Sequence, residues 1–164
     1  MMAIYIGLGA NLDHPAAQLR LAIDAMNALP TTQVVACSSF YRSAPVGPQD
    51  QPDFVNAVAE IHTELTPLAL LDALQGIERD QGRVKRRHWG ERCIDLDILL
   101  YHDHTQRSDR LNLPHHEMTR RGFVVQPLLE IAPDLTLPDG QRLDQITPEF
   151  GNDLQRLDAA VIDL

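Results

Sequence analysis

The sequence has little cysteine, no long apolar run and few positive charges. Only Cys37 and Cys93 occur among 164 residues, too few for a disulfide framework, so we expect the protein to work in the reducing cytoplasm. No stretch approaches the about 20 apolar residues of a membrane span, and no basic segment followed by an apolar signal region opens the chain. We therefore expect no membrane partner. The 14 basic residues against 23 acidic ones give a net charge of −9, which argues against general nucleic-acid binding.

The common nucleotide-binding motifs are also missing. The chain contains neither a Gly-x-x-x-x-Gly-Lys-Ser/Thr phosphate loop nor the motifs of protein kinases. A dinucleotide fingerprint is excluded as well, because Gly7 and Gly9 are followed by Leu12 where a third glycine is required. Any use of ATP must therefore rest on another architecture.

The length and the hydrophobic content of 44% predict a single domain over residues 1–164 with a sizeable core. Residues 3–9, 32–41, 54–61 and 94–100 have the alternation or composition of strands. Helices are predicted from Pro15, with Asp13 as N-cap, and from Pro67 after Thr66. This double β-α-β order predicts an α+β fold with a split βαβ arrangement.

The predicted helices carry apolar residues at helical spacing. Their core faces are expected to comprise Leu19, Ala22, Ile23, Met26 and Leu29 in the first, and Leu68, Leu71, Leu74 and Ile77 or Glu78 in the second. Further along we expect a buried helical segment at 124–131, a short hairpin at 135–143, and a helix with a tail of uncertain order from about residue 147.

An Asp-x-Asp pair lies within the predicted strand 94–100. Alternation puts Asp95, Asp97 and Leu99 on one face, and the four aliphatic residues Ile94, Leu96, Ile98 and Leu100 on the other. Carboxylates two apart on a strand are separated by roughly 6.5 to 7 Å, so they can bind Mg²⁺ and leave its other positions to water and phosphate. The spacing alone leaves open a second interpretation, the solvated polar face of an edge strand.

Six of the 14 basic residues gather just before this pair, within residues 79–92 and mostly between Gly82 and Gly90. Arginine dominates, and its planar fork binds phosphate oxygens bidentately. A small polyanion such as a nucleotide fits such a patch on an acidic protein, although a solvated surface loop or a patch for an acidic partner has the same composition.

Two other clusters carry candidate binding groups. Residues 42–52 are rich in proline and predict a shaped loop, after which Phe54 and Asn56 share one strand face and suit a flat heterocycle. Two imidazoles, two guanidiniums and a ring gather within residues 115–123. His102 and His104 have no partner with zinc-site spacing and are expected on the surface.

Together an Asp pair, a basic loop and a His/Arg cluster predict phosphoryl transfer, which needs positioning and charge neutralisation above all. A nucleotide-sugar glycosyltransferase is an alternative, but the chain is short for that fold. A non-enzymatic binding module is a second alternative.

The same residues form ordered blocks that resemble the 6-hydroxymethyl-7,8-dihydropterin pyrophosphokinase family of folate biosynthesis. In one-letter code the blocks are SFYRS at 39–43 with GPQDQPDFVN at 47–56, HWGERCIDLDIL at 88–99, and PHHEM at 114–118 with RGF at 121–123. The resemblance covers residues 4–140 approximately, and the middle block is the most specific. It implies a ferredoxin-like αβ sandwich, mainly antiparallel, with helices on its faces.

The resemblance also implies a reaction. ATP, as co-substrate, would give its β,γ-diphosphate to the hydroxymethyl group of the dihydropterin, with AMP as the other product. The partners would be these small molecules alone, and the protein would act as a monomer.

The implied site comprises four sets of residues. Asp95 and Asp97 would bind two Mg²⁺ ions, with Asp95 also near the pterin, while Arg83, Arg92, His115 and Arg121 would contact phosphates. The pterin would bind among Phe54, Phe123, Asn56 and the segment Ser43, Ala44, Pro45, Val46 and Gly47. Trp89 would close over the site, and Leu71, Glu78, Ile98, Leu111, Asn112 and His116 would lie beside the nucleotide. Two departures from the family pattern, a shorter basic loop and His88 in place of a frequent arginine, bear on loop closure.

Overall fold

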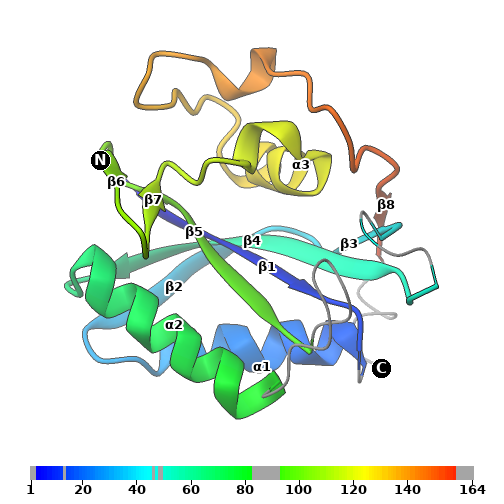
Figure 1. The fold of residues 1–164 in the computed structure, drawn as a ribbon, viewed down its shortest axis with the longest axis horizontal. Coiled ribbons are helices and arrows are strands. Elements are labelled where there is room, and N and C mark those ends of the chain that lie inside the picture. Colours follow the sequence, from blue (N-terminus) through cyan, green and yellow to red (C-terminus); the bar gives the residue numbers. More distant parts are fainter. Residues whose placement is uncertain (1–2, 13, 46, 48–49, 83–92, 158–164) are drawn as a thin grey trace.

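The computed structural model describes residues 3–12, 14–45, 47, 50–82 and 93–157. A central antiparallel sheet separates two helices on one face from a third helix on the other (Figure 1). The strands are β1 Ile4–Ala10, β2 Thr32–Cys37, β3 Tyr41–Ser43, β4 Phe54–Thr63, β5 Asp95–Tyr101, β6 Gln106–Arg107, β7 Asn112–Leu113 and β8 Gln155–Arg156. The helices are α1 Pro15–Asn27, α2 Pro67–Gly82 and α3 Gly122–Ile131, with short 3₁₀ turns η1 Met118–Arg120 and η2 Leu143–Gln145.

The strand order confirms the predicted fold class. The main sheet runs β5-β1-β4-β3-β8, and β2 also pairs with β4. The units β1-α1-β2 and β4-α2-β5 therefore interleave as the split βαβ pattern of a ferredoxin-like fold. Within the described part of the chain, no helix is long and apolar enough to cross a membrane.

Each face of the sheet has its own apolar core. Leu19 and Met26 of α1 and Leu70 and Leu74 of α2 are fully buried against one face. On the other face α3 contributes Leu128, which packs in a separate cluster with residues of β1, β4 and β5. Burying one such side chain stabilises the fold by about 1.5 to 3 kcal/mol, so the packing on both faces contributes to the stability of the sheet.

The helix starts agree only in part with the sequence. Thr66 caps α2, since its Oγ1 accepts a hydrogen bond from the Ala69 backbone amide at 3.3 Å. In α1 the N-cap position belongs to His14, in a left-handed conformation, so the prediction of Asp13 was wrong. On α2 the predicted core residue Leu68 is 42% exposed, and Leu70 is buried instead.

Two predicted strands differ because of tertiary contacts. The strand predicted at 32–41 is interrupted after Cys37. There the Ser38 hydroxyl accepts a hydrogen bond from the Val58 backbone amide at 2.9 Å, in place of a backbone carbonyl of the neighbouring strand. In β5 the register steps from Tyr5↔Leu100 to Ile6↔Ile98, which leaves Leu99 as a bulge. Leu100 therefore packs in the α3-side cluster, not with Ile98 as alternation predicted.

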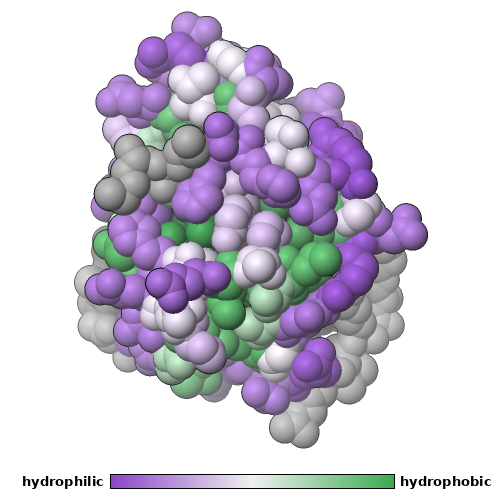
Figure 2. All heavy atoms as spheres, turned by 90° about the vertical axis from the view of Figure 1, so that its left-hand side faces the viewer, coloured by the Kyte–Doolittle hydropathy of each residue, from purple (hydrophilic) through white to green (hydrophobic). Residues whose placement is uncertain are grey.

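The last part of the chain also departs from its prediction. The hairpin at 135–143 is present as a turn, with an antiparallel bridge between Thr136 and Arg142. The helix expected from residue 147 is absent over residues 147–157, which are extended and end in β8. Viewed from the side that carries β6 and β7, the surface is mostly polar around a smaller apolar patch (Figure 2).

Candidate active site

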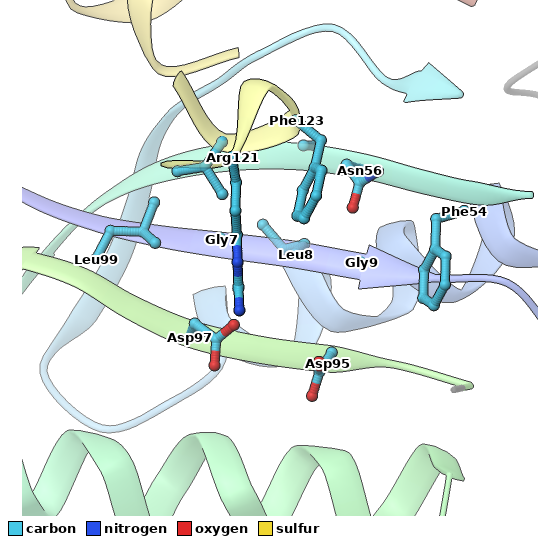
Figure 3. A pocket seen from close by; sticks show the side chains of 12 residues that line it. Gly7, Leu8, Gly9, Phe54, Asn56, Asp95, Asp97, Leu99, Arg121 and Phe123 are labelled. Atoms are coloured by element: carbon cyan, nitrogen blue, oxygen red, sulfur yellow. The ribbon is translucent and has the colours of Figure 1, made fainter. Parts of the chain in front are cut away.

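A pocket lies on the α3 side of the sheet, over β1, β4 and β5. It encloses about 620 Å³, counting the part that opens to solvent. Its lining comprises Gly7, Leu8, Gly9, Phe54, Asn56, Ala57, Asp95, Asp97, Leu99, Arg121, Phe123 and Val124. Figure 3 shows these side chains around the pocket, among them Phe54, Asn56, Asp95, Asp97, Arg121 and Phe123.

The two aspartates stand on one face of β5. Both are half-buried, and they pair in register with Gly9 and Gly7 of β1. Both glycines line the pocket, and the Leu99 side chain packs where a Cβ of Gly7 would lie, at 3.3 Å. Among the described residues, no cluster of three or more His, Cys, Asp or Glu could hold a metal. A cation held by Asp95 and Asp97 would complete its shell with other ligands such as water or phosphate, as Mg²⁺ does.

Glu78 connects α2 to the strand that carries these aspartates. Its Oε2 accepts a hydrogen bond from the Leu96 backbone amide at 2.8 Å. Leu96 lies between Asp95 and Asp97, so this bond fixes the backbone from which both carboxylates project. The predicted nucleotide-pocket residue thus has a clear positioning contact.

Two aromatic rings flank the other end of the pocket. Figure 3 shows Phe54 and Phe123 on either side of Asn56. The Asn56 amide is buried and donates to the Ser43 hydroxyl at 2.8 Å, which fixes its orientation. A Cβ at Gly9 would lie only 2.9 Å from Asn56 Oδ1, so this position has no room for a side chain. The arrangement can hold a flat ring between aromatic faces with an amide at its edge.

Arg121 connects the aromatic end to the acidic end. Its side chain extends from the start of α3 toward Asp97 (Figure 3), and its guanidinium carbon is 5.7 Å from the Phe123 ring centroid. It is half-buried, so its positive charge acts on the pocket with less screening than in bulk water.

His115 is held neutral beside this arginine. Burial, then the charges of Arg121 and His116, lower its pKa to about 4, although Glu117 and Asp95 oppose the shift. The Glu117 backbone amide donates to His115 Nδ1 at 3.1 Å, so the proton of the neutral ring resides on Nε2. His115 therefore offers one uncharged donor. The ring of His116 stacks on it at 5.0 Å, but the side chain of His116 is 63% exposed.

The other predicted residues have different places. Leu71, Ile98 and Leu111 are buried in the core cluster on the α1/α2 side and do not line this pocket. Asn112 is half-buried in β7. Ser43 and Pro45 are buried, Ala44 is exposed and Gly47 is half-buried. The predicted site residues Arg83, Trp89, Arg92 and Val46, together with the basic loop, lie outside the described residues.

Sequence reasoning missed part of the pocket floor. Gly7, Leu8 and Gly9 line it, whereas the sequence assigns them to a strand, excludes a dinucleotide motif and predicts no contact with a ligand. Leu99 and Val124 also line it, and both look like ordinary core residues in the sequence. The glycine spacing was the one available signal, because it marks a place where backbone must approach another group closely.

Comparison with known proteins gives relatives over most of the chain. The profile of the 7,8-dihydro-6-hydroxymethylpterin-pyrophosphokinase (HPPK) family matches residues 5–133. A 2-amino-4-hydroxy-6-hydroxymethyldihydropteridine pyrophosphokinase of Haemophilus influenzae is 53% identical over 152 residues, which are 93% of this chain and 95% of the relative. The protein of the same name from Pseudomonas aeruginosa is 51% identical over 143 residues, 87% of this chain and 88% of the relative.

A solved structure shares the fold at low identity. The HPPK-DHPS protein of Plasmodium falciparum superposes with a TM-score of 0.66 at 13% identity, over 88% of this chain and 42% of that longer chain. The profile match extends over the strands and the helix start that build the pocket. The chain therefore belongs to the 7,8-dihydro-6-hydroxymethylpterin-pyrophosphokinase family.

Proposed function

We propose that this protein transfers diphosphate from ATP to the hydroxymethyl group of 6-hydroxymethyl-7,8-dihydropterin, a reaction of folate biosynthesis. The hydroxyl oxygen forms a bond to the β-phosphorus, and the bond from that phosphorus to the oxygen shared with the α-phosphate breaks. AMP leaves with the electron pair, and the hydroxyl proton is released. Family membership supports the reaction. The observation that carries it in this chain is one pocket in which two aromatic rings lie next to two carboxylates and an arginine.

Asp95 and Asp97 are the proposed ligands of two Mg²⁺ ions. Hard oxygen donors on one strand face, beside a glycine-lined space, fit this cation. When bound, the ions would neutralise the charge of the transferring phosphates. Glu78 supports the same role indirectly, because its bond to Leu96 keeps the two carboxylates on a fixed backbone.

Arg121 and His115 are the proposed phosphate-binding side chains described by the structure. The guanidinium supplies a permanent charge, and the neutral imidazole donates from Nε2 without adding a second charge. The resemblance adds Arg83, Arg92 and Trp89 to this set. By the same resemblance, Leu71, Ile98, Leu111, Asn112 and His116 would lie beside the nucleotide.

Phe54 and Phe123 are the proposed walls for the pterin ring. Stacking on an aromatic face is worth about 0.5 to 1.5 kcal/mol beyond the buried area. Asn56, whose amide is held by the Ser43 hydroxyl, would bind the edge of the ring. The segment from Ser43 to Gly47, which includes Val46, would contribute backbone groups. These roles together place the hydroxymethyl group on the side of Asp95 and Asp97.

The molecular setting forms part of the same proposal. We expect residues 1–164 to act as one catalytic domain and as a monomer, without a nucleic-acid or membrane partner. The sequence contains only two cysteines, Cys37 and Cys93, which fits the reducing cytoplasm as the place of action.

The deciding experiment is product identification by mass spectrometry after incubating the purified protein with ATP, Mg²⁺ and the hydroxymethyl dihydropterin. The expected products are AMP and the pterin diphosphate. ADP with a pterin monophosphate would move the attack to the γ-phosphorus and overturn the proposed transfer. No conversion by folded protein would overturn it altogether.

A further inference from the structure

The segment of residues 149–157, here called the strap, crosses from the start of α3 to β3. It is extended, and its far end forms β8 beside β3 (Figure 1). One end of its path meets the start of α3, beside the pocket residues Arg121 and Phe123. The other end meets β3, whose last residue, Ser43, binds the pocket residue Asn56.

At α3 the strap is bound through its backbone. Phe150 forms a parallel bridge with Arg121, and its carbonyl accepts the Gly122 amide at 2.8 Å. The Glu149 amide donates to the Arg120 carbonyl at 2.9 Å, and the Glu149 carboxylate accepts from the Arg120 side chain. These bonds hold the residues on both sides of Arg121 to the strap.

The next residue of the strap touches an aromatic wall of the pocket. Gly151 has a φ of 71°, and a Cβ built on it would lie 2.5 Å from Cδ2 of Phe123. A Cβ on Gly122 would lie 2.5 Å from the Gly151 carbonyl oxygen. The two glycines therefore allow backbone to lie directly against backbone and against the Phe123 ring. Any side chain at Gly151 would displace that ring.

Beyond Gly151 the strap contacts the residue that follows β3. Asp153 Oδ2 accepts a hydrogen bond from the Ala44 backbone amide at 3.1 Å. Strand β8 then pairs with β3 through Tyr41↔Arg156, and the Leu157 amide donates to the Phe40 carbonyl at 2.9 Å. Ser43, which fixes Asn56, directly precedes the amide that Asp153 holds.

We infer that the strap sets the distance between the Phe123 wall and the segment that starts at Ser43, with Gly151 and Asp153 as positioning residues for the flat substrate. This inference rests on the proposed function, since the occupant of the pocket is the dihydropterin. Gly151 and Asp153 contact the aromatic end of the site, through the Phe123 ring and the Ala44 amide, so substitutions at these two residues should act on the flat substrate.

The test compares Asp153→Ala with Asp153→Asn and with a matched control. In the control, Asp139→Ala, the lost carboxylate also accepts a backbone amide, that of Gln141 at 3.0 Å, in a turn away from the pocket. Calorimetry would measure dihydropterin affinity in the presence of a non-hydrolysable ATP analogue, and the affinity for the analogue alone. Steady-state kinetics would give kcat and the KM of each substrate.

For Asp153→Ala we expect the dissociation constant and KM of the pterin to rise about three- to tenfold, the range for one lost hydrogen bond. The affinity for the ATP analogue should not change. Asp153→Asn should restore most of the pterin affinity, because its amide oxygen still accepts from Ala44. Asp139→Ala should leave both affinities as in the unchanged protein. Gly151→Ala should weaken pterin binding more than Asp153→Ala does, through displacement of Phe123.

Pterin affinity unchanged in a folded Asp153→Ala protein would overturn the inference, as would an equal loss for both substrates. If Gly151→Ala does not fold, the comparison of Asp153→Ala with Asp153→Asn still tests the inference. Failure of the unchanged protein to bind or convert the dihydropterin would instead count against the proposed function, so the two failures are distinguishable.

Discussion

At the scale of single residues, the site depends on glycines that make room for polar groups. Gly9 pairs with Asp95 across the sheet and lies under Asn56. We predict that Gly9→Ala weakens dihydropterin binding, because its methyl group would approach Asn56 Oδ1 to 2.9 Å and shift the amide. Overpacking at such a place also costs about 1 to 3 kcal/mol of stability. Calorimetric binding and thermal unfolding would measure the two effects.

The matched control is Gly76→Ala in the middle of α2. A Cβ there meets only the end of the Arg79 side chain, at 3.6 Å. Alanine should raise stability at this helical position by about 0.5 to 1 kcal/mol and leave binding unchanged. Equal binding by the Gly9 and Gly76 variants would contradict the proposed role of Gly9.

The carboxylates of β5 give the second residue-scale prediction. Asp95→Ala and Asp97→Ala should each lower kcat at least about a hundredfold, since each removes a proposed Mg²⁺ ligand worth several kcal/mol in the transition state. Thermal unfolding should show folded protein in both cases. Asp72→Ala, which removes an exposed carboxylate paired with Arg110 at 2.5 Å, is the control. Retained turnover in either β5 variant would refute the metal assignment.

These residues also show what sequence can provide. Asp95, Asp97, Phe54 and Asn56 were identifiable because alternation along a strand assigns neighbours two apart to one face. The role of Gly151 was not identifiable, because it depends on contact with Phe123, which lies 28 positions earlier in the chain. Local periodicity carries no information about such approaches between distant segments.

At the scale of elements, α3 is attached to the strand region 39–41 through Glu130. Its Oε2 accepts from the Ser39 amide and hydroxyl, each at 2.9 Å, and its Oε1 accepts from the Tyr41 hydroxyl. Burial would raise the pKa of Glu130, but these bonds and the charge of Arg156 outweigh it and hold the pKa below the ordinary value of 4.5. The carboxylate form is thus favoured in the folded state.

We predict that Glu130→Gln flattens the acid side of the stability profile. Because the folded pKa is depressed, the contribution of Glu130 is complete above pH 4.5 and is lost as pH falls through the lower folded pKa. The variant should be about 1 kcal/mol less stable at pH 7, and the difference should shrink below pH 4.5. Urea unfolding over this pH range measures it. Glu64→Gln, on an exposed turn, is the control, and a constant difference at all pH values would contradict the prediction.

The elements were predicted best where a regular spacing of apolar residues marks one buried face. The repeats of α1 and α2 and the alternation of β1 and β4 were sufficient to place those elements within a few residues. The break between β2 and β3 was not predictable, because a serine hydroxyl replaces a backbone partner there. The extended course of residues 149–157 depends likewise on bonds to α3 and β3 rather than on local preference.

At the scale of the whole molecule, the ferredoxin-like sheet has the pocket on one face and the α1/α2 core on the other. Helices α1 and α2 pack on one face of the sheet, while the pocket lies on the other face, under the start of α3 (Figure 1). The two cores therefore differ in what they support. The α1/α2 core holds the sheet together, and the α3 core also holds Arg121 and Phe123 over it.

This division predicts different outcomes for the same substitution on the two faces. Leu19 in α1 and Leu128 in α3 are both 0% exposed, so Leu19→Ala and Leu128→Ala should each lower stability by about 2 to 5 kcal/mol. Only Leu128→Ala should also weaken dihydropterin binding at a temperature where both proteins are folded, because α3 begins at the pocket. Thermal unfolding and calorimetric binding on the same samples test this. A binding loss of equal size in the Leu19 variant would mean that the site responds to global stability, and that the separation of the two faces has no functional consequence.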